Sequence, residues 1–518
     1  MKILKSITTV GFFTMGSRIF GYFRDMLMAA LLGAGPITDA MVVAIKLPSL
    51  FRRLLAEGAF NAAFVPMFSG IYATSGHDES KTMAEEVLSF LIMVLIGLVI
   101  IAEIFIPWLM PVFVPGFKAT PDRLALAISF ARITFPFILF ISITALYSGI
   151  LNSLDKFAAV AASPMMGNIF IIGLVVFLSP VINDSGSLFA FAIFGCGIIQ
   201  LLWVMLPCNK IGFKLSLRLP RLTPSVKKLL MLIAPVALGS GVHQINVLIG
   251  TAIASVLSVG SISYLYYAER LNQLPLSVIG TAMGTVLLPM LSKQLQTGNK
   301  LDAQKTQNDG IQLAMILTMP AMVGLISLSL PIIKGLYQHG AFSVKESEMT
   351  AHALMMYATG LPAYILMKIF NTCFYAQKDT KTPLKAALLS VVVDIVLSIV
   401  FIKFCNMGHI GIALATSLAA WVNAIFLGSL LWKQDFFIID DQLRRFMPKL
   451  VISSVVTMVY LETIQRYSPN CFGTEKWGNL LHMSFLVISG LVVYVITAKK
   501  TGTIDMNQIR LQFKKNTA

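Results

Sequence analysis

The sequence carries little charge. Aspartate, glutamate, lysine and arginine make up only 12% of its 518 residues, whereas hydrophobic residues make up 57%. Soluble proteins carry about a quarter charged residues, so this chain has too few to cover a water-exposed surface of its size. Apolar runs of about 20 residues, which suffice for a helix to cross a bilayer, recur along it. The composition excludes a soluble globular protein and predicts an integral membrane protein.

Cysteine is scarce, and the sequence lacks the common motifs of catalysis. Its five cysteines show no CxxC spacing and its six histidines are dispersed, so neither a disulfide framework nor a metal site is predicted. The sequence contains no GxxxxGK[ST], HExxH or GxSxG. We therefore expect no metal, no cofactor and no enzymatic activity. A transport process would have to draw on a coupling cation, the membrane potential or the substrate itself.

The apolar segments and the turn signals between them predict an all-α polytopic protein with about fourteen transmembrane helices. The expected spans are residues 7–32, 37–69, 87–113, 124–151, 157–179, 187–208, 227–257, 262–292, 308–336, 348–376, 384–403, 408–432, 446–464 and 478–498. Most of the 40 lysine and arginine residues fall on the side that would hold both termini. Because cytoplasmic loops are enriched in these residues, both termini are predicted to be cytoplasmic.

The net charge of +16 is then mostly a feature of the inner leaflet, and no nucleic-acid partner is needed to explain it. The most basic loop, NKIGFKLSLRLPRLTPSVKK at residues 209–228, alternates cations with apolar residues and contains two prolines. Proline forbids a continuous helix there. We expect this loop to be a linker lying on anionic membrane lipids.

A weak internal repeat organises the spans. A shift of 223 residues aligns Gly16–Ser17 with Gly239–Ser240 and FVPMFS (64–69) with LLPMLS (287–292). Spans one to six and seven to twelve also have similar lengths and loops, which is typical of transporters built from parallel repeats. We expect a six-helix lobe at 1–225, a second at 226–433, and two extra transmembrane helices with a cytoplasmic tail at 434–518.

Charged residues concentrate inside the first two spans. They are Arg18, Arg24, Asp25, Asp39, Lys46, Arg52, Arg53 and Glu57. Five cations facing lipid would cost roughly 12–18 kcal/mol, although those near a span end can extend to the interface. Internal ion pairs are one explanation, but five cations outnumber three acids. Surplus guanidinium groups favour an external anion, and their planar fork suits phosphate. Glu269 and Arg270 add a charged pair in the second lobe.

Asp394 lies within the eleventh predicted span. A carboxylate inside the membrane predicts either a proton or cation site or a hydrogen bond between helices. Both readings stay open from the residues alone.

Three segments carry a resemblance to a known family. GSRIFGYFRD (16–25), TDAMVVAIKLPSLFRRLLAEGAFNAAFVPMFS (38–69) and YYAERLNQLP (266–275) resemble the signatures of the MurJ (MviN) lipid II flippases. That family belongs to the superfamily of multidrug extruders and polysaccharide-unit flippases. The resemblance implies two six-helix lobes around a central cavity, with the last two helices holding a polyprenyl tail.

The resemblance also implies site residues. Those matching the family's cavity are Arg18, Arg24, Asp39, Arg52 and Arg270, with Asp25, Lys46, Arg53, Glu57 and Glu269 in supporting places. Position 269 is Asp in many relatives, and Glu keeps its charge. Family members with a bound sodium use carboxylates and amides in spans seven and eleven. Only Asp394 matches that set here, as a residue for ion coupling.

The function implied is the transfer of lipid II from the inner to the outer leaflet of the bacterial cytoplasmic membrane by alternating access, for cell-wall synthesis and cell shape. Expected partners are lipid II, membrane lipids and cell-wall synthesis proteins. Two alternatives are flipping of another polyprenyl-diphosphate-linked oligosaccharide and export of drugs or cations, although an exporter of cations would favour acids in its cavity. An enzyme acting on polyprenyl diphosphates would need clustered acids such as DDxxD, which the sequence lacks.

Overall fold

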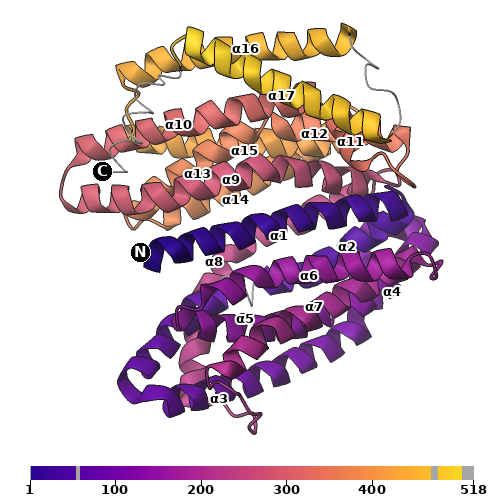
Figure 1. Cartoon of the computed structure of the whole chain (residues 1–518), viewed down its shortest axis with the longest axis vertical. Coiled ribbons are helices and arrows are strands. Elements are labelled where there is room, and N and C mark those ends of the chain that lie inside the picture. Colours follow the sequence, from indigo (N-terminus) through magenta and orange to yellow (C-terminus); the bar gives the residue numbers. More distant parts are fainter. Residues whose placement is uncertain (1, 54–58, 468–475, 504–518) are drawn as a thin grey trace. The chain divides into compact units, whose positions relative to one another are not determined.

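The computed structural model describes residues 2–53, 59–467 and 476–503, and every regular element within them is a helix. The contacts between residues divide the chain into unit 1, Met1–Ser263, and unit 2, Tyr264–Ala518. The prediction of an all-α membrane protein is confirmed. Each unit is built from long apolar helices connected by short loops (Figure 1).

Unit 1 is a bundle of packed helices. Its elements are α1 (Lys2–Leu32), α2 (Pro36–Arg52), α3 (Ala59–Phe113), the 3₁₀ helix η2 (Pro115–Ala119), α4 (Pro121–Thr134), α5 (Phe137–Ser153), α6 (Phe157–Leu178), α7 (Ser185–Lys210) and α8 (Pro224–Ser255). α1 packs along α6, and α6 along α7 (Figure 1). α5 packs on α3 and α7, and α8 packs on α3. Phenylalanines of α3, among them Phe64 and Phe68, are fully buried in the core.

Two helix boundaries in unit 1 differ from the predicted ones. Residues Ala59–Phe113 form two helices that meet at a kink at Gly76 (φ 83°), so the helices that carry the predicted spans 37–69 and 87–113 both extend as far as this glycine. Glycine reaches this positive φ without the clash that a Cβ would cause. The predicted span 124–151 is two helices, because the chain turns at Phe135–Pro136.

Unit 2 contains the second set of helices. α9 (Ser261–Gln296) begins in the last residues of unit 1 and is followed by α10 (Lys300–Ser327), α11 (Ser329–Tyr337), α12 (Val344–Ala358), α13 (Leu361–Ala376), α14 (Lys381–Lys403), α15 (Gly408–Lys433), α16 (Asp441–Tyr467) and α17 (Lys476–Lys500). The predicted spans 308–336 and 348–376 are each divided into two helices.

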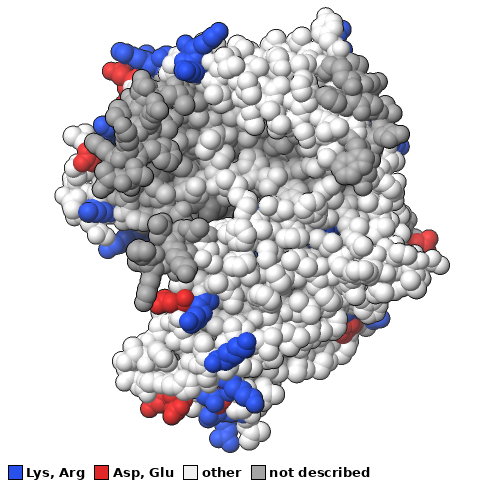
Figure 2. All heavy atoms as spheres, viewed as in Figure 1, with Lys and Arg blue, Asp and Glu red and all other residues white. Residues whose placement is uncertain are grey.

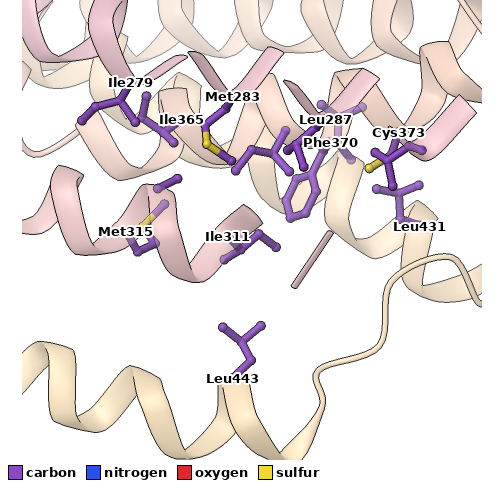
Figure 3. Close-up of a cluster of buried hydrophobic side chains, with 14 of the residues drawn as sticks. Ile279, Met283, Leu287, Ile311, Met315, Ile365, Phe370, Cys373, Leu431 and Leu443 are labelled. Atoms are coloured by element: carbon purple, nitrogen blue, oxygen red, sulfur yellow. The ribbon is translucent and has the colours of Figure 1, made fainter. Parts of the chain in front are cut away.

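The core of unit 2 lies between α9, α10, α13, α15 and α16. Its labelled side chains in Figure 3 are Ile279, Met283, Leu287, Ile311, Met315, Ile365, Phe370, Cys373, Leu431 and Leu443. The C-terminal pair α16 and α17 pack on each other and on α10, and their prediction as an addition to a repeat stays a prediction.

Eleven helical segments among the described residues are long and apolar enough to cross a membrane. Every predicted span falls on one helix or on two consecutive helices, whereas the count of fourteen stays a prediction. The predicted lobe boundaries also stay a prediction. The contact-based division falls at Ser263, after α8, because α8 packs on α3 of unit 1. On the face shown in Figure 2, charged side chains lie in a few groups, and the broad areas between these groups are uncharged.

Candidate substrate site

The first predicted cation cluster is held between α1 and α6. Arg24 donates to Asp25 Oδ1 from Nε (3.1 Å) and Nη2 (2.8 Å), and its Nη1 donates to Asn168 Oδ1 on α6 (3.1 Å). Asp25 is buried, at 2% exposure, whereas the Arg24 side chain is 24% exposed. The ion pair therefore neutralises part of the charge of Arg24 and orients its guanidinium group.

Asn168 was not predicted from the sequence. Its amide also donates to the Ser17 carbonyl (3.2 Å), so it connects α6 to α1 at two points. The available signal was a single asparagine within the apolar segment MMGNIFII. Glycines of GSRIFGYFRD allow this close approach: a Cβ on Gly16 would lie 2.8 Å from Met165 Sδ.

Arg18 differs from Arg24. It is partly exposed on α1 and makes no hydrogen bond or ion pair with the residues that the structure describes. It precedes Arg24 by six residues, which is about 9 Å along a helix. Arg18 thus lies near the Arg24–Asp25 pair, and no described acid neutralises the charge of Arg18.

Arg52 lies in the last turn of α2, and both Arg52 and Arg24 lie near Cys196 of α7. Lys46, one and a half turns earlier on α2, donates to Thr251 Oγ1 on α8 (3.0 Å). Arg53 is exposed, and Glu57 lies outside the described residues.

Asp39 lies in a different place. It is fully buried at the start of α2, about 20 Å along that helix from Arg52. Its carboxylate pairs with Arg123 of α4 and accepts hydrogen bonds from the Gly260 amide (2.7 Å) and from Ser263 N (2.8 Å) and Oγ (2.6 Å). These are the features of an internal ion pair at the N-terminus of a helix, α9. The predicted role of Asp39 in binding substrate stays a prediction.

Arg123 was also missed, because it directly precedes the predicted span 124–151. It is 3% exposed, and its guanidinium carbon lies 3.9 Å from the centre of the Phe117 ring. The sequence signal was PDRLALA, an arginine in the first turn of an apolar helix.

In unit 2, Arg270 lies next to Tyr266 on α9. Its Nη2 donates to the Tyr266 hydroxyl (3.1 Å), and its guanidinium carbon lies 5.0 Å from the centre of that ring. One turn apart on the same helix, Gln273 donates to Glu269 (2.7 Å). The tyrosine and glutamine thus position the two charged side chains, one cation and one acid.

Asp394 joins two helices of unit 2. It is 8% exposed on α14 and accepts a hydrogen bond from Thr416 Oγ1 on α15 (3.2 Å). This hydrogen bond connects α14 to α15, as expected for a contact between helices. Among the described residues, no group of three or more His, Cys, Asp or Glu side chains could hold a metal ion. The predicted role of Asp394 in ion coupling stays a prediction.

Comparison with known proteins extends over nearly the whole chain. The family described as "Lipid II flippase MurJ" matches residues 28–477. The "Probable lipid II flippase MurJ" of Rhizobium tropici is 38% identical over 523 residues, which cover 99% of this chain and 97% of that protein. The "Lipid II flippase MurJ" of Burkholderia cenocepacia is 32% identical over 460 residues, covering 88% of this chain and 89% of that protein.

Comparison with solved structures gives the same family. A structure described as "Lipid II flippase MurJ, inward closed conformation" superposes with a TM-score of 0.77 at 30% identity and covers 94% of this chain and 97% of its own. An inward-facing multidrug transporter of the MATE family gives a TM-score of 0.65 at 15% identity and shares the fold alone. The resemblance predicted from the three motifs is confirmed, and the chain belongs to the MurJ family.

Proposed function

We propose that this protein flips lipid II from the inner to the outer leaflet of the bacterial cytoplasmic membrane, as a step in peptidoglycan synthesis. One observation carries the proposal: proteins named as lipid II flippases match this chain from end to end, at 38% identity over 99% of it for the Rhizobium tropici protein. The protein acts as a transporter, and the proposal includes no catalytic step.

The arginines supply the chemistry for binding a lipid-linked diphosphate. Arg18, with no described acid beside it, is the cation that an external anion would neutralise. Arg24 is already oriented by Asp25 and Asn168, so its side chain loses less conformational entropy on binding a phosphate than a mobile side chain would. Arg52 adds a guanidinium group at the end of α2, and unit 2 carries a guanidinium group of its own, Arg270. Bidentate guanidinium–phosphate contacts are strong and directional.

We propose that the membrane potential helps to drive transfer. Moving about two negative charges outward across roughly 100 mV, inside negative, is favourable by about 4–5 kcal/mol. The same potential would return the emptied, cationic site to the inner side. A coupling cation at Asp394 remains a second energy source within this proposal. Both termini lie in the cytoplasm in this account, as the distribution of lysine and arginine predicts.

The alternatives are less well supported. A flippase of another polyprenyl-diphosphate-linked oligosaccharide would use the same cations, but the relatives at 32–38% identity are named for lipid II. The likeness to MATE transporters extends to the fold only, at 15% identity.

Cells depleted of their own flippase test the proposal. They would carry this protein, or its Arg24→Ala or Arg270→Ala variant at equal expression, and the lipid II accessible at the outer leaflet would be measured. We expect the parent protein to restore accessible lipid II and each variant to lose most of that activity. No restoration by the parent would reject the proposed function. Full restoration by both variants would reject the proposed site.

A further inference from the structure

The linker between α7 and α8 is held against unit 1 by specific contacts. Its non-helical part, residues 211–223, is here called the strap. Glu85 of α3 accepts hydrogen bonds from Ser216 N (3.1 Å), Ser216 Oγ (2.8 Å) and Arg218 Nε (2.7 Å). Ser89 accepts from the Arg218 amide (2.8 Å). The strap therefore has a fixed path along α3.

Each end of the strap is also anchored. At one end, Phe213 is 1% exposed and packs on Phe68 and His77 of α3. At the other end, Thr223 donates to Glu86 (2.8 Å) and caps the start of α8 through the Val226 amide. With both ends and the middle held, the side chains that point away from α3 have a defined position.

Those outward side chains are leucines and cations. Leu217, Leu219 and Leu222 are 69%, 77% and 61% exposed. Exposed cations accompany them: Lys210, Lys214, Arg221, Lys227 and Lys228. Within the described part of the chain, none of these five cations forms an ion pair, whereas Arg218 pairs with Glu85. Exposed leucines beside unpaired cations match an anionic lipid surface, which offers both an apolar layer and negative headgroups.

The strap lies at the depth where headgroups are expected. It contacts α3 at Glu85, Glu86 and Ser89, just where the charged turn of that helix ends. From there, residues 87–102 contain no charged side chain, and Met93, Ile96 and Ile100 among them are exposed as lipid-facing residues would be. The membrane span of α7 ends at Lys210, directly before the strap. Two separate helices thus place it at the edge of the bilayer.

We propose that the strap is an anionic-lipid binding surface, in which Leu217, Leu219 and Leu222 enter the headgroup layer and the unpaired cations bind phospholipid phosphates. Glu85 fixes the strap by neutralising Arg218 on the protein side, which leaves the remaining cations to the lipid. This surface lies within unit 1, and its occupant is bulk anionic phospholipid rather than a transported molecule. The proposal does not depend on flipping.

Fluorescence quenching in vesicles tests the proposal on the full-length protein. An environment-sensitive label would be attached at Leu219→Cys, with Cys405 and Cys471 replaced by serine and the buried Cys196, Cys208 and Cys373 retained. The matched control is Glu79→Cys, exposed on α3 about 12 Å before the uncharged run. Vesicles would contain phosphatidylglycerol or phosphatidylcholine alone.

In phosphatidylglycerol vesicles, we expect a nitroxide attached near the lipid headgroup to quench the Leu219→Cys label and aqueous iodide to quench the Glu79→Cys label. Each cation near an anionic surface contributes roughly fivefold in partitioning. Lys214→Gln with Arg221→Gln, or phosphatidylcholine vesicles, should therefore lower the lipid-phase quenching at Leu219→Cys severalfold.

Three results would overturn the proposal. Equal quenching of both labels by iodide would place the strap in water. Protection of the Leu219→Cys label from both quenchers would show that protein covers it. Equal lipid-phase quenching in both vesicle types, unchanged by the two glutamine substitutions, would show apolar insertion without recognition of anionic lipid.

Discussion

At the scale of single residues, the intramembrane charges fall into two groups with different surroundings. Asp39 and Arg123 are both buried and form an ion pair, and Asp39 also accepts hydrogen bonds from the first turn of α9. Arg18 and Arg24 are partly exposed on α1, and Asp25 offsets only part of their charge. The charges of the buried pair offset each other within the fold, whereas an exposed cation surplus is what an anionic substrate can use. Residue type alone does not separate the two groups.

Removing Asp39 should destabilise unit 1. Asp39→Ala leaves Arg123 as a buried, unpaired cation, which costs about 3–5 kcal/mol. We expect a clear fall in the melting temperature of the purified protein in detergent. Asp39→Ala combined with Arg123→Met should recover much of that loss, because no buried charge is left unpaired. Equal melting temperatures for the parent and Asp39→Ala would contradict the structural role of this ion pair.

Asn168 should affect the affinity for lipid II because it orients Arg24. Asn168→Ala removes a hydrogen bond to a charged group, and we expect roughly tenfold weaker lipid II binding. Asn168→Asp keeps an acceptor for Arg24 but adds a negative charge beside it and loses the donor to the Ser17 carbonyl, so it should also weaken binding, whereas Asn183→Ala, in the exposed loop before α7, is the neutral control. Binding to the purified protein in nanodiscs measures all three. Unchanged binding by Asn168→Ala would show that Asn168 does not position Arg24.

At the scale of helices, the sequence predicts where apolar segments lie better than where helices end. All fourteen predicted spans coincide with helices, because long apolar runs leave the backbone few alternatives in a membrane. The extension of two helices as far as the kink at Gly76 and the break at Pro136 were missed. Each depends on one residue's backbone conformation, which hydrophobicity does not encode. The pairing of Asn168 with Arg24 was missed because helix packing, rather than sequence spacing, brings α6 to α1.

Gly76 and Gly70, both in α3, should respond oppositely to substitution. Gly76→Ala forces a Cβ into positive φ at a cost of about 1–2 kcal/mol. Gly70 lies in regular helix with open space around it, so Gly70→Ala should stabilise the protein by about 0.5–1 kcal/mol. Thermal unfolding of both variants beside the parent is the measurement. A more stable Gly76→Ala protein would show that the turn does not require glycine.

At the scale of the whole molecule, the fold and the family were predictable and the site only in part. Low charge, long apolar runs and three motifs identify the class and the family. The site depends on which charges find internal partners after folding, as the contrast between Asp39 and Arg18 shows. No spacing rule could reveal that Asp39 meets Arg123 and Ser263, which lie 84 and 224 residues further along the chain.

The most direct test of the account is transfer of lipid II by the purified protein. Proteoliposomes with an imposed membrane potential and labelled lipid II would carry the parent, Arg18→Ala or Lys156→Ala, the last an exposed loop cation outside the site. The measurement is the rate at which the headgroup becomes accessible to an impermeant reagent. We predict transfer by the parent and by Lys156→Ala, and a large loss with Arg18→Ala. Equal rates for all three proteins, or no transfer by the parent, would contradict the account.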